Sequence, residues 1–162
     1  MHGVVLGLHV NPNGGVPKHP VETLDVQPDG CVGDRQNDRR HHGGPTRAVC
    51  IMEERVMRRL QEQGHPIQPG STGENLLVGG LEAEALRVGS VLRIGALVLR
   101  ITGDAPPCKT IKASFQRDEF RALSHKVNPG NTRWYAEVCE ASTIALGDEV
   151  VLVNGDEPAG NQ

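Results

Sequence analysis

The sequence predicts a mainly β domain with a few short helices. Only 2% of its 162 residues are aromatic, whereas it contains 20 Gly and 11 Pro, so the core has to be built from Val, Leu, Ile and Ala between many turns. The clearest local pattern is a pair of alternating apolar runs, residues 91–94 and 97–101, separated by Gly95-Ala96. These features favour short strands that form the wall of a barrel or a sandwich.

One domain is expected. The length of the chain falls within the usual range of a single domain, and a chain of this length can bury a core without disulfide bonds or a structural metal. We place the domain over residues 1–154. Residues 155–162 offer no apolar side chains that could anchor them to a core, so we expect a flexible tail there.

Charge and hydropathy argue against several classes of partner. The chain has 17 basic and 20 acidic residues, a formal net charge of −3, and the two signs are mixed along it, so we expect no nucleic-acid partner. The first ten residues have no basic segment and too short an apolar run for a signal peptide or a membrane span. We therefore expect a cytoplasmic protein that does not bind a membrane. The four cysteines lie far apart with no C-x-x-C pair, which favours reduced thiols.

The first half of the chain is predicted to hold three strands and a helix. Apolar or alternating runs predict strands at residues 3–10, 22–27 and 47–52. Val56, Met57 and Leu60 then recur at helical spacing within residues 53–63, and Gly64 ends that helix.

The hairpin at residues 91–101 is the best-defined element. A two-residue turn that opens with Gly is typical of a type II′ hairpin. In the register this turn imposes, one face is apolar and consists of Leu92, Ile94, Leu97, Leu99 and Ile101. Arg93, Val98 and Arg100 point the other way, so one side of the hairpin lines a core and the other is partly wet.

The last third of the chain is predicted to contain a second helix and two strands. Residues 118–127 place Phe120, Leu123 and Val127 on one face of a short helix. Residues 133–139 and 149–153 are expected to close the domain as strands.

Cys108 is the strongest candidate for a reactive residue. It follows Ala105-Pro106-Pro107 after the second hairpin strand, so the chain leaves the sheet close to this thiol. Lys109 is its neighbour, and a helical turn after Cys108 would add free backbone amides that stabilise a thiolate. The alternative is a buried, inert cysteine. We assign that role to the cysteines that lie in apolar strand patterns, which are Cys31, Cys50 and Cys139.

A glycine-rich segment, residues 33–35 and 41–47, is crowded with charged and imidazole groups. It could bind an anion through backbone amides and arginines. It could equally be a solvated surface loop, because the standard phosphate-loop pattern does not occur. A zinc site is disfavoured by the absence of the usual ligand spacings; its residues would be Cys31, His41, His42 and Cys50.

Residues 70–75 place Glu74 and Asn75 at the start of the apolar run 76–78, beside glycine turns. Turn capping and ligand binding both account for a carboxylate and an amide in this position. The sequence leaves the two open.

Several short segments, taken in order, resemble the MOSC family, the molybdenum cofactor sulfurase C-terminal domain. The resemblance spans most of residues 3–153. The segments that carry it are Gly33-Asp34-Arg35, the run from His42 to Val49, Pro69-Gly70, Gly73-Glu74-Asn75-Leu76, Val88-Gly89, Pro107-Cys108, the run from Arg133 to Val138, and Gly147-Asp148. Each is short, and their shared order makes the resemblance specific.

The resemblance implies a closed or partly open β-barrel with a cleft cysteine that carries a persulfide or ligates molybdenum. Position by position, this residue is Cys108. The residues carried over as the lining of the cleft, where they would hold the anionic pterin-phosphate part of a molybdenum cofactor, are Arg35, His42, Arg47, Asn75 and Arg133. Two or more arginines suit a phosphate. Many relatives place an arginine shortly before the Pro-Cys pair, where this chain has Asp104-Ala105-Pro106, so the charge or orientation of the ligand is expected to differ.

Three functions follow from the resemblance. In the first, Cys108 takes a sulfane sulfur from a donor persulfide and passes it to a metal-sulfur acceptor. In the second, Cys108 is a molybdenum ligand in a reductase of small N-hydroxylated compounds. In the third, the barrel is a non-catalytic module that binds the cofactor. We expect no pyridoxal phosphate in the chain itself. The sulfur donor would then be a separate pyridoxal phosphate-dependent cysteine desulfurase, and the electron donor a separate redox partner.

Overall fold

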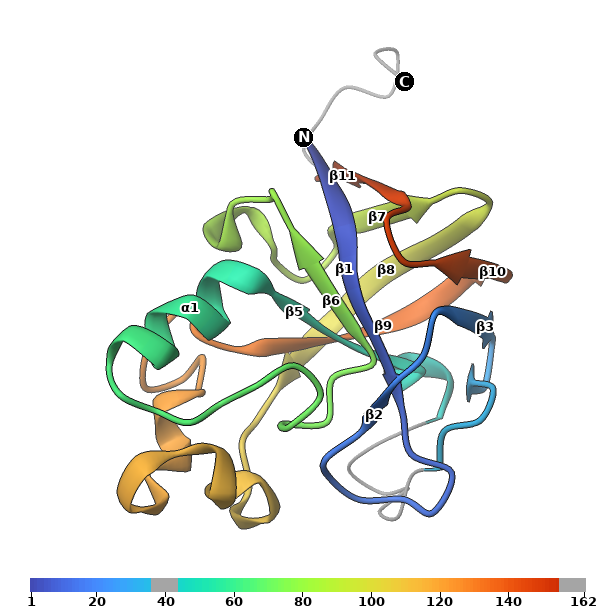
Figure 1. Cartoon of the computed structure of the whole chain (residues 1–162). Helices are drawn as coiled ribbons and strands as arrows, with labels where there is room; N and C mark the ends of the chain where they lie inside the picture. Colours follow the sequence, from blue (N-terminus) through green and yellow to red (C-terminus); the bar gives the residue numbers. More distant parts are fainter. Residues whose placement is uncertain (36–43, 155–162) are drawn as a thin grey trace.

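Seven strands close into a β-barrel in the computed structural model, which describes residues 1–35 and 44–154. The order around the barrel is β11-β7-β8-β9-β5-β6-β1, and β1 pairs again with β11 (Figure 1). The strands are β1 (His2–Val10), β5 (Val49–Glu53), β6 (Leu76–Gly79), β7 (Val91–Ile94), β8 (Leu97–Ala105), β9 (Arg133–Glu140) and β11 (Glu149–Val153). The mainly β, barrel-like fold expected from the sequence is confirmed.

The barrel interior is apolar because the inward positions of each strand are aliphatic. The predicted hairpin is present in the predicted register, with Ile94 opposite Leu97 and Leu92 opposite Leu99. Gly95 at the turn has a φ of 59°, the left-handed conformation that the first central residue of a type II′ turn requires. The five residues assigned to the inner face are at most 1% exposed, and Arg93 and Arg100 on the outer face are exposed.

The helix α1 (Glu54–Glu62) connects the parallel strands β5 and β6, as a crossover between parallel strands requires. Glu53 caps it, its side chain accepting a hydrogen bond from the amide of Arg55 at 2.9 Å. Val56, Met57 and Leu60 are buried as predicted. They pack in a second apolar cluster outside the barrel, together with Ile111, Phe115 and Leu123.

The helix predicted for residues 118–127 is not formed. Residues 109–122 instead make three short 3₁₀ turns, η3 (Lys109–Ser114), η4 (Gln116–Asp118) and η5 (Phe120–Ala122), of which only the end of η4 and η5 fall within the predicted helix. Arg117 and Asp118 have φ values of 54° and 56°, and a right-handed helix cannot pass through two left-handed residues. Leu123 is buried as expected, but Val127 is 60% exposed, so the three residues do not share one buried face.

A small second sheet lies beside the barrel. It consists of β3 (Thr23–Gln27) between β10 (Ser142–Ala145) and the two-residue β4 (Gly30–Cys31). The two-residue β2 (His19–Pro20) extends the main sheet from β1. Two further 3₁₀ turns, η1 (Pro45–Arg47) and η2 (Ala83–Ala85), lie in connections. The proposed tail, residues 155–162, lies outside the described residues.

In residues 1–35 and 44–154, no helix has the length and apolar character needed to span a membrane.

Candidate active site

Cys108 lies between the end of β8 and the start of η3. Strand β8 ends at Ala105, and the thiol is half-buried at the cap position of η3. The residues after it do turn, because the amide of Ile111 donates to the Cys108 carbonyl at 3.1 Å. The Cys108 Sγ lies 2.7 Å from the Thr110 Oγ1. A hydroxyl at this position can donate a hydrogen bond to the sulfur when the sulfur is a negatively charged thiolate.

Arg133 at the start of β9 fixes the segment that precedes Cys108. Its side chain is buried, with 4% exposure. It donates from Nη2 to the carbonyls of Ala105 and Pro106 at 3.3 and 3.1 Å, and from Nη1 to the carbonyl of Thr72 at 2.5 Å. Within the described part of the chain its Nε has no partner. Arginine side chains carry a positive charge in proteins, and a positive charge favours an anion nearby.

Tyr135 lies on the same outward face of β9 as Arg133. It pairs in register with Cys50 of β5, and both pack with Ala105 outside the barrel core. The Arg47 guanidinium lies over the Tyr135 ring, 5.4 Å from its centroid. Burial raises the pKa of Tyr135 well above its usual value, and the nearby Cys50 and Cys108 act in the same direction, while Arg133 and Arg47 oppose the rise. The phenol therefore stays protonated and is able to donate a hydrogen bond.

A buried ion pair lies at the end of β1. The Lys18 Nζ is 2.6 Å from the Asp34 Oδ2, and the two side chains are 6% and 3% exposed. Asp34 also accepts from the Asn75 Nδ2 at 2.9 Å and from the amide of Asn11 at 2.8 Å. Asn75 donates to the carbonyl of His9 at 3.1 Å and accepts from the amide of Cys50 at the same distance. Residues 9–18, Asp34, Cys50 and Asn75, which lie far apart in the sequence, are thus tied together.

Glu74 and His9 complete this buried group. Glu74 accepts from the amide of Gly70 and from the Thr72 hydroxyl, both at 2.8 Å. The His9 Nδ1 is buried and has no partner among the described residues. Burial lowers the pKa of His9, and nearby Glu74 opposes the shift while Lys18 adds to it. We call His9, Lys18, Asp34, Glu74 and Asn75 the buried polar network.

The structure brings some of the predicted site residues together. Cys108, Arg47 and Arg133 all lie close enough to Tyr135 to act on its ionisation or its ring. Asn75 is fully buried and both of its amide hydrogens are bonded within the protein, so here it holds the scaffold. Arg35 is exposed directly after Asp34. His42 lies outside the described residues.

The other cysteines differ from one another. Burial raises the pKa of Cys31 to about 12 and also raises that of Cys50, as expected for inert thiols. Cys139 is exposed, so the expectation that it is buried in a strand is wrong. It lies near the C-terminal end of β9, where the side chains of the strand are no longer buried. No cluster of three metal-ligating side chains occurs in residues 1–35 and 44–154. Two members of the disfavoured zinc set, His41 and His42, fall outside those ranges.

Sequence reasoning missed Tyr135, Thr110 and three members of the buried polar network, His9, Lys18 and Asp34, as site residues, whereas it singled out Glu74 and Asn75. Strand alternation was the available signal for Tyr135, since it puts this residue on the face of Arg133. The network offered no such signal, because its members come from four separate segments and polar residues in loops are usually exposed.

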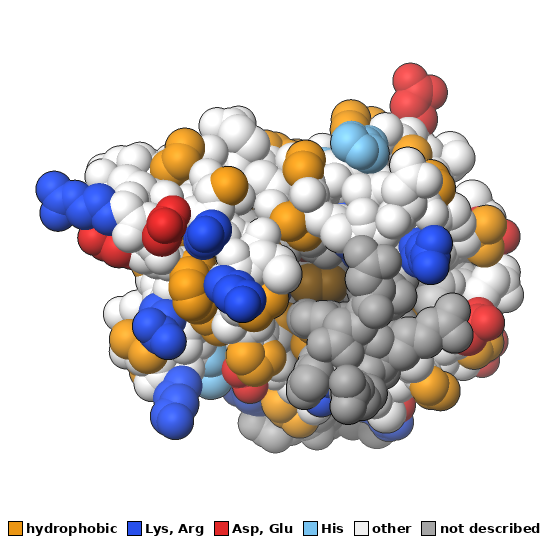
Figure 2. Space-filling view, turned by 90° about the horizontal axis from the view of Figure 1, so that it is seen from below, with side chains coloured by type: hydrophobic (Ala, Val, Ile, Leu, Met, Phe, Trp, Pro, Cys, Tyr) orange, Lys and Arg blue, Asp and Glu red, His pale blue; other side chains and the backbone are white. Residues whose placement is uncertain are grey.

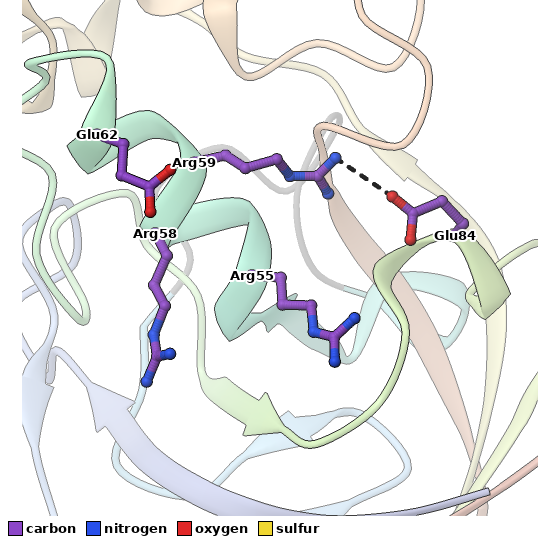
Figure 3. Close-up of a pocket in the computed structure, with 5 residues that line it drawn as sticks. All are labelled: Arg55, Arg58, Arg59, Glu62 and Glu84. Atoms are coloured by element: carbon purple, nitrogen blue, oxygen red, sulfur yellow. Dashed lines mark hydrogen bonds and ion pairs between the residues drawn. The ribbon is translucent and has the colours of Figure 1, made fainter.

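A pocket of about 300 Å³ lies against α1, apart from all of these residues. It is lined by Arg55, Arg58, Arg59, Glu62 and Glu84 (Figure 3). Arg59 donates to Glu84 at 3.3 Å and Arg58 pairs with Glu54. The charges that line the pocket are therefore largely compensated within the protein, and we assign the pocket no ligand.

The sequence matches the MOSC domain family over residues 38–151, and the chain belongs to that family. The family is linked to binding of the molybdenum cofactor. Among curated proteins, the chain is similar to the uncharacterized protein YflK of Bacillus subtilis, with 28% identity over 88% of this chain and 65% of that protein. It is also similar to protein YiiM of Escherichia coli, with 26% identity over 77% of this chain and 57% of YiiM. The chain thus spans roughly three fifths of the length of these relatives.

Solved structures show the same fold. The YuaD protein of Bacillus subtilis superposes with a TM-score of 0.77 at 19% identity, covering 94% of this chain and 96% of that one. YiiM from Geobacillus stearothermophilus gives a TM-score of 0.72 at 20% identity, covering 94% of this chain and 75% of that one.

A third curated relative is a fungal protein named as a reductase, from Gibberella moniliformis. It is 25% identical over 80% of this chain, which amounts to 23% of that protein.

Proposed function

We propose that this chain is a sulfur-handling MOSC-domain protein in which Cys108 carries a sulfane sulfur as a persulfide and transfers it to a metal-sulfur acceptor. The observation that carries the proposal is the setting of Cys108: a half-buried thiol at the cap of η3, touching the Thr110 hydroxyl. The carbonyls just before it are held by the buried Arg133. A thiol that only filled space would need neither a hydroxyl contact nor partial exposure.

Loading of Cys108 is a thiol exchange. The Cys108 thiolate attacks the outer sulfur of a donor persulfide, a new S–S bond forms at Cys108, and the donor leaves as its thiolate. Thr110 donates a hydrogen bond to the anionic sulfur, and the Arg133 charge favours that anion. The donor would be a separate protein, a pyridoxal phosphate-dependent cysteine desulfurase.

The residues fit a molybdenum cofactor in part. The Cys108 thiolate is a soft ligand suited to molybdenum, and the exposed Arg35 and the half-buried Arg47 suit the pterin phosphate. Arg133 and Asn75 would support the site from behind, because the Asn75 amide hydrogens and both Nη groups of Arg133 are bonded within the protein. When bound, the molybdenum would supply redox chemistry. His42 remains a proposed ligand contact.

A molybdenum-dependent reductase of small N-hydroxylated compounds is the second candidate. The similarity to the fungal protein named as a reductase favours it. In that reading Cys108 is a permanent metal ligand and a separate redox partner supplies the electrons. Because this chain corresponds to 23% of that protein, the reductase activity of the relative could reside in its other parts. A non-catalytic cofactor-binding module is the third reading.

Intact mass and elemental analysis of one preparation separate these functions. The protein is purified without reductant from cells that make the cofactor, as wild type, Cys108→Ser and Cys139→Ser. A sulfur carrier gains one sulfur that reductant removes, in wild type and Cys139→Ser but not in Cys108→Ser. A reductase instead contains stoichiometric molybdenum that Cys108→Ser loses. Equal sulfur content and equal molybdenum content in the three proteins would contradict both the sulfur-carrier and the reductase functions. The non-catalytic cofactor-binding module would then be the remaining function.

A further inference from the structure

Five basic residues lie on the surface that continues from Cys108. They are Lys109, Lys112, Arg117, Arg121 and Lys126, all exposed and carried by η3, η4, η5 and the residues just after. With two acidic residues, the segment 109–126 has a formal charge of +3. The rest of the chain, with 12 basic and 18 acidic residues, has −6. We call these five residues the basic face.

The basic face lies at one end of the barrel. The segment η3 to η5 projects below the strands in Figure 1. Figure 2 looks onto that end, and Lys and Arg side chains gather on one side of the view, next to a hollow with hydrophobic side chains at its floor. Since η3 begins at the residue after Cys108, a partner on the basic face would lie next to the thiol.

The backbone beneath these charges is anchored. Ile111, Phe115 and Leu123 are at most 3% exposed and pack against α1. The Phe115 ring makes an edge contact with His65 at 5.2 Å, and the Arg121 guanidinium lies 5.2 Å from the centre of the Phe120 ring. Arg117 is held in a left-handed conformation at an exposed turn. A surface ordered before binding loses less conformational entropy when a partner docks.

We propose that the basic face docks an acidic protein surface that presents a sulfur-bearing cysteine to Cys108. The inference rests on the proposed function, which requires a separate donor. A protein suits the face better than a nucleic acid does, because Asp118 and Glu119 interrupt the positive charge and the aromatic rings of the segment are not open for base stacking. Complementary charge at the rim of such an interface accelerates encounter and is weakened by salt.

The test measures thiol exchange between Cys108 and two defined peptides. Each carries one cysteine as a mixed disulfide with 2-nitro-5-thiobenzoate; one is flanked by six Glu and the other by six Gln. Attack by Cys108 joins the peptide to Cys108 and releases the coloured thiolate, so one S–S bond breaks as one forms. All proteins carry Cys139→Ser, which removes the other exposed thiol. At low salt we expect the Glu peptide to react about ten-fold faster than the Gln peptide, and 0.5 M salt, about three times physiological ionic strength, to abolish the difference.

Two variants locate the effect. Replacing Lys112, Arg117 and Arg121 by Glu together should remove the preference for the Glu peptide while leaving the Gln peptide rate unchanged, because none of the three touches Cys108. Arg93→Glu, at the exposed face of β7, is the matched control and should keep the preference. An unchanged preference in the triple variant would overturn the proposal. Stronger inhibition by an oligonucleotide than by a cysteine-free Glu peptide would also overturn it and assign the face to nucleic acid.

Inorganic polysulfide at 0.5 M salt separates this proposal from the one on which it rests. Polysulfide needs no docking surface and at this salt its own negative charge is screened, so its transfer to Cys108 should be equal in wild type and in the triple variant. Failure of polysulfide to load wild-type Cys108 would remove the sulfur-carrier function, whereas the peptide preference would still decide whether the basic face binds acidic chains.

Discussion

The buried polar network and the Cys108 segment are both polar, but they are built in opposite ways. In the network, a lysine and an aspartate are almost fully removed from water and their neighbours hold them with further hydrogen bonds. Cys108 is half-exposed, on a segment of short 3₁₀ turns. The difference indicates that one region fixes the geometry and the other meets reactants. Thr72 joins them, because its hydroxyl bonds to Glu74 and its carbonyl to Arg133.

The largest effect is expected from Asp34→Ala, which tests the stabilising region. The change leaves the Lys18 ammonium buried without its carboxylate and removes an acceptor from Asn75 and the Asn11 amide. Breaking a buried pair on one side costs about 3–5 kcal/mol, which urea unfolding would measure. Glu149→Gln, which disturbs the exposed His2–Glu149 pair, is the control and should cost about 0–1 kcal/mol. A loss below about 1 kcal/mol for Asp34→Ala would show that the Lys18–Asp34 ion pair contributes little to the free energy of unfolding.

Arg133→Met should affect both regions. It leaves the carbonyls of Thr72, Ala105 and Pro106 without their donor, and we expect a loss of about 2–3 kcal/mol from the unpaired buried groups. It also frees the segment before Cys108 and removes a nearby positive charge, so alkylation of Cys108 by iodoacetamide should slow several-fold.

Arg133→Lys separates the two roles of this arginine. A lysine keeps the charge but cannot reproduce the fork of donors. Arg133→Lys should therefore alkylate at Cys108 faster than Arg133→Met does, while its free energy of unfolding stays below that of the wild type. Identical alkylation rates in wild type and Arg133→Met would show that Arg133 supports the fold alone.

The individual strands could be predicted from the sequence because their signals are local, whereas the choice of a barrel over a sandwich came from the family resemblance. Alternation fixed the inner face of the hairpin, and Gly95 fixed its turn. The second helix could not be excluded in this way. Apolar spacing permits a helix there and carries no signal for the left-handed backbone at Arg117 and Asp118, which lie between the buried residues Phe115 and Leu123.

The site shows the same limit. Cys108 stands out by its position after a strand, and the family resemblance adds Arg47 and Arg133. The buried pair does not stand out, since Lys18 lies in a proline-rich loop and Asp34 in a polar one. Their burial follows from the closure of the barrel, which brings β1, β6 and the segment before residue 36 together.

Thr110→Val tests the reactive region alone. It removes the hydroxyl that contacts the Cys108 sulfur and replaces it with a methyl group of the same size. A neutral hydrogen bond is worth about 1 kcal/mol, so alkylation of Cys108 at neutral pH should slow about five-fold. Because Thr110 is exposed, the free energy of unfolding should not change. Thr110→Ser should react like wild type; equal rates for the Val and Ser variants would remove the hydroxyl from the mechanism.

The smallest effect is a pH dependence of stability that belongs to His9. Burial lowers the pKa of this imidazole in the folded protein, with Lys18 adding to the shift and Glu74 opposing it. In the unfolded chain the pKa is about 6.5, so the unfolded state binds the proton first. The stabilising contribution is therefore complete above about pH 6.5 and is lost as pH falls through that value toward the folded pKa.

Urea unfolding between pH 7.5 and 5 should show this loss in wild type and a shallower one in His9→Gln. The slope is the proper readout, because His9 fits closely against Gly7 and Gly70 and any replacement lowers stability at every pH. One group can contribute no more than about 1.4 kcal/mol per pH unit. Parallel curves for the two proteins would mean that His9 takes up its proton equally in both states. The buried polar network would then tolerate a charge that its dry surroundings should exclude.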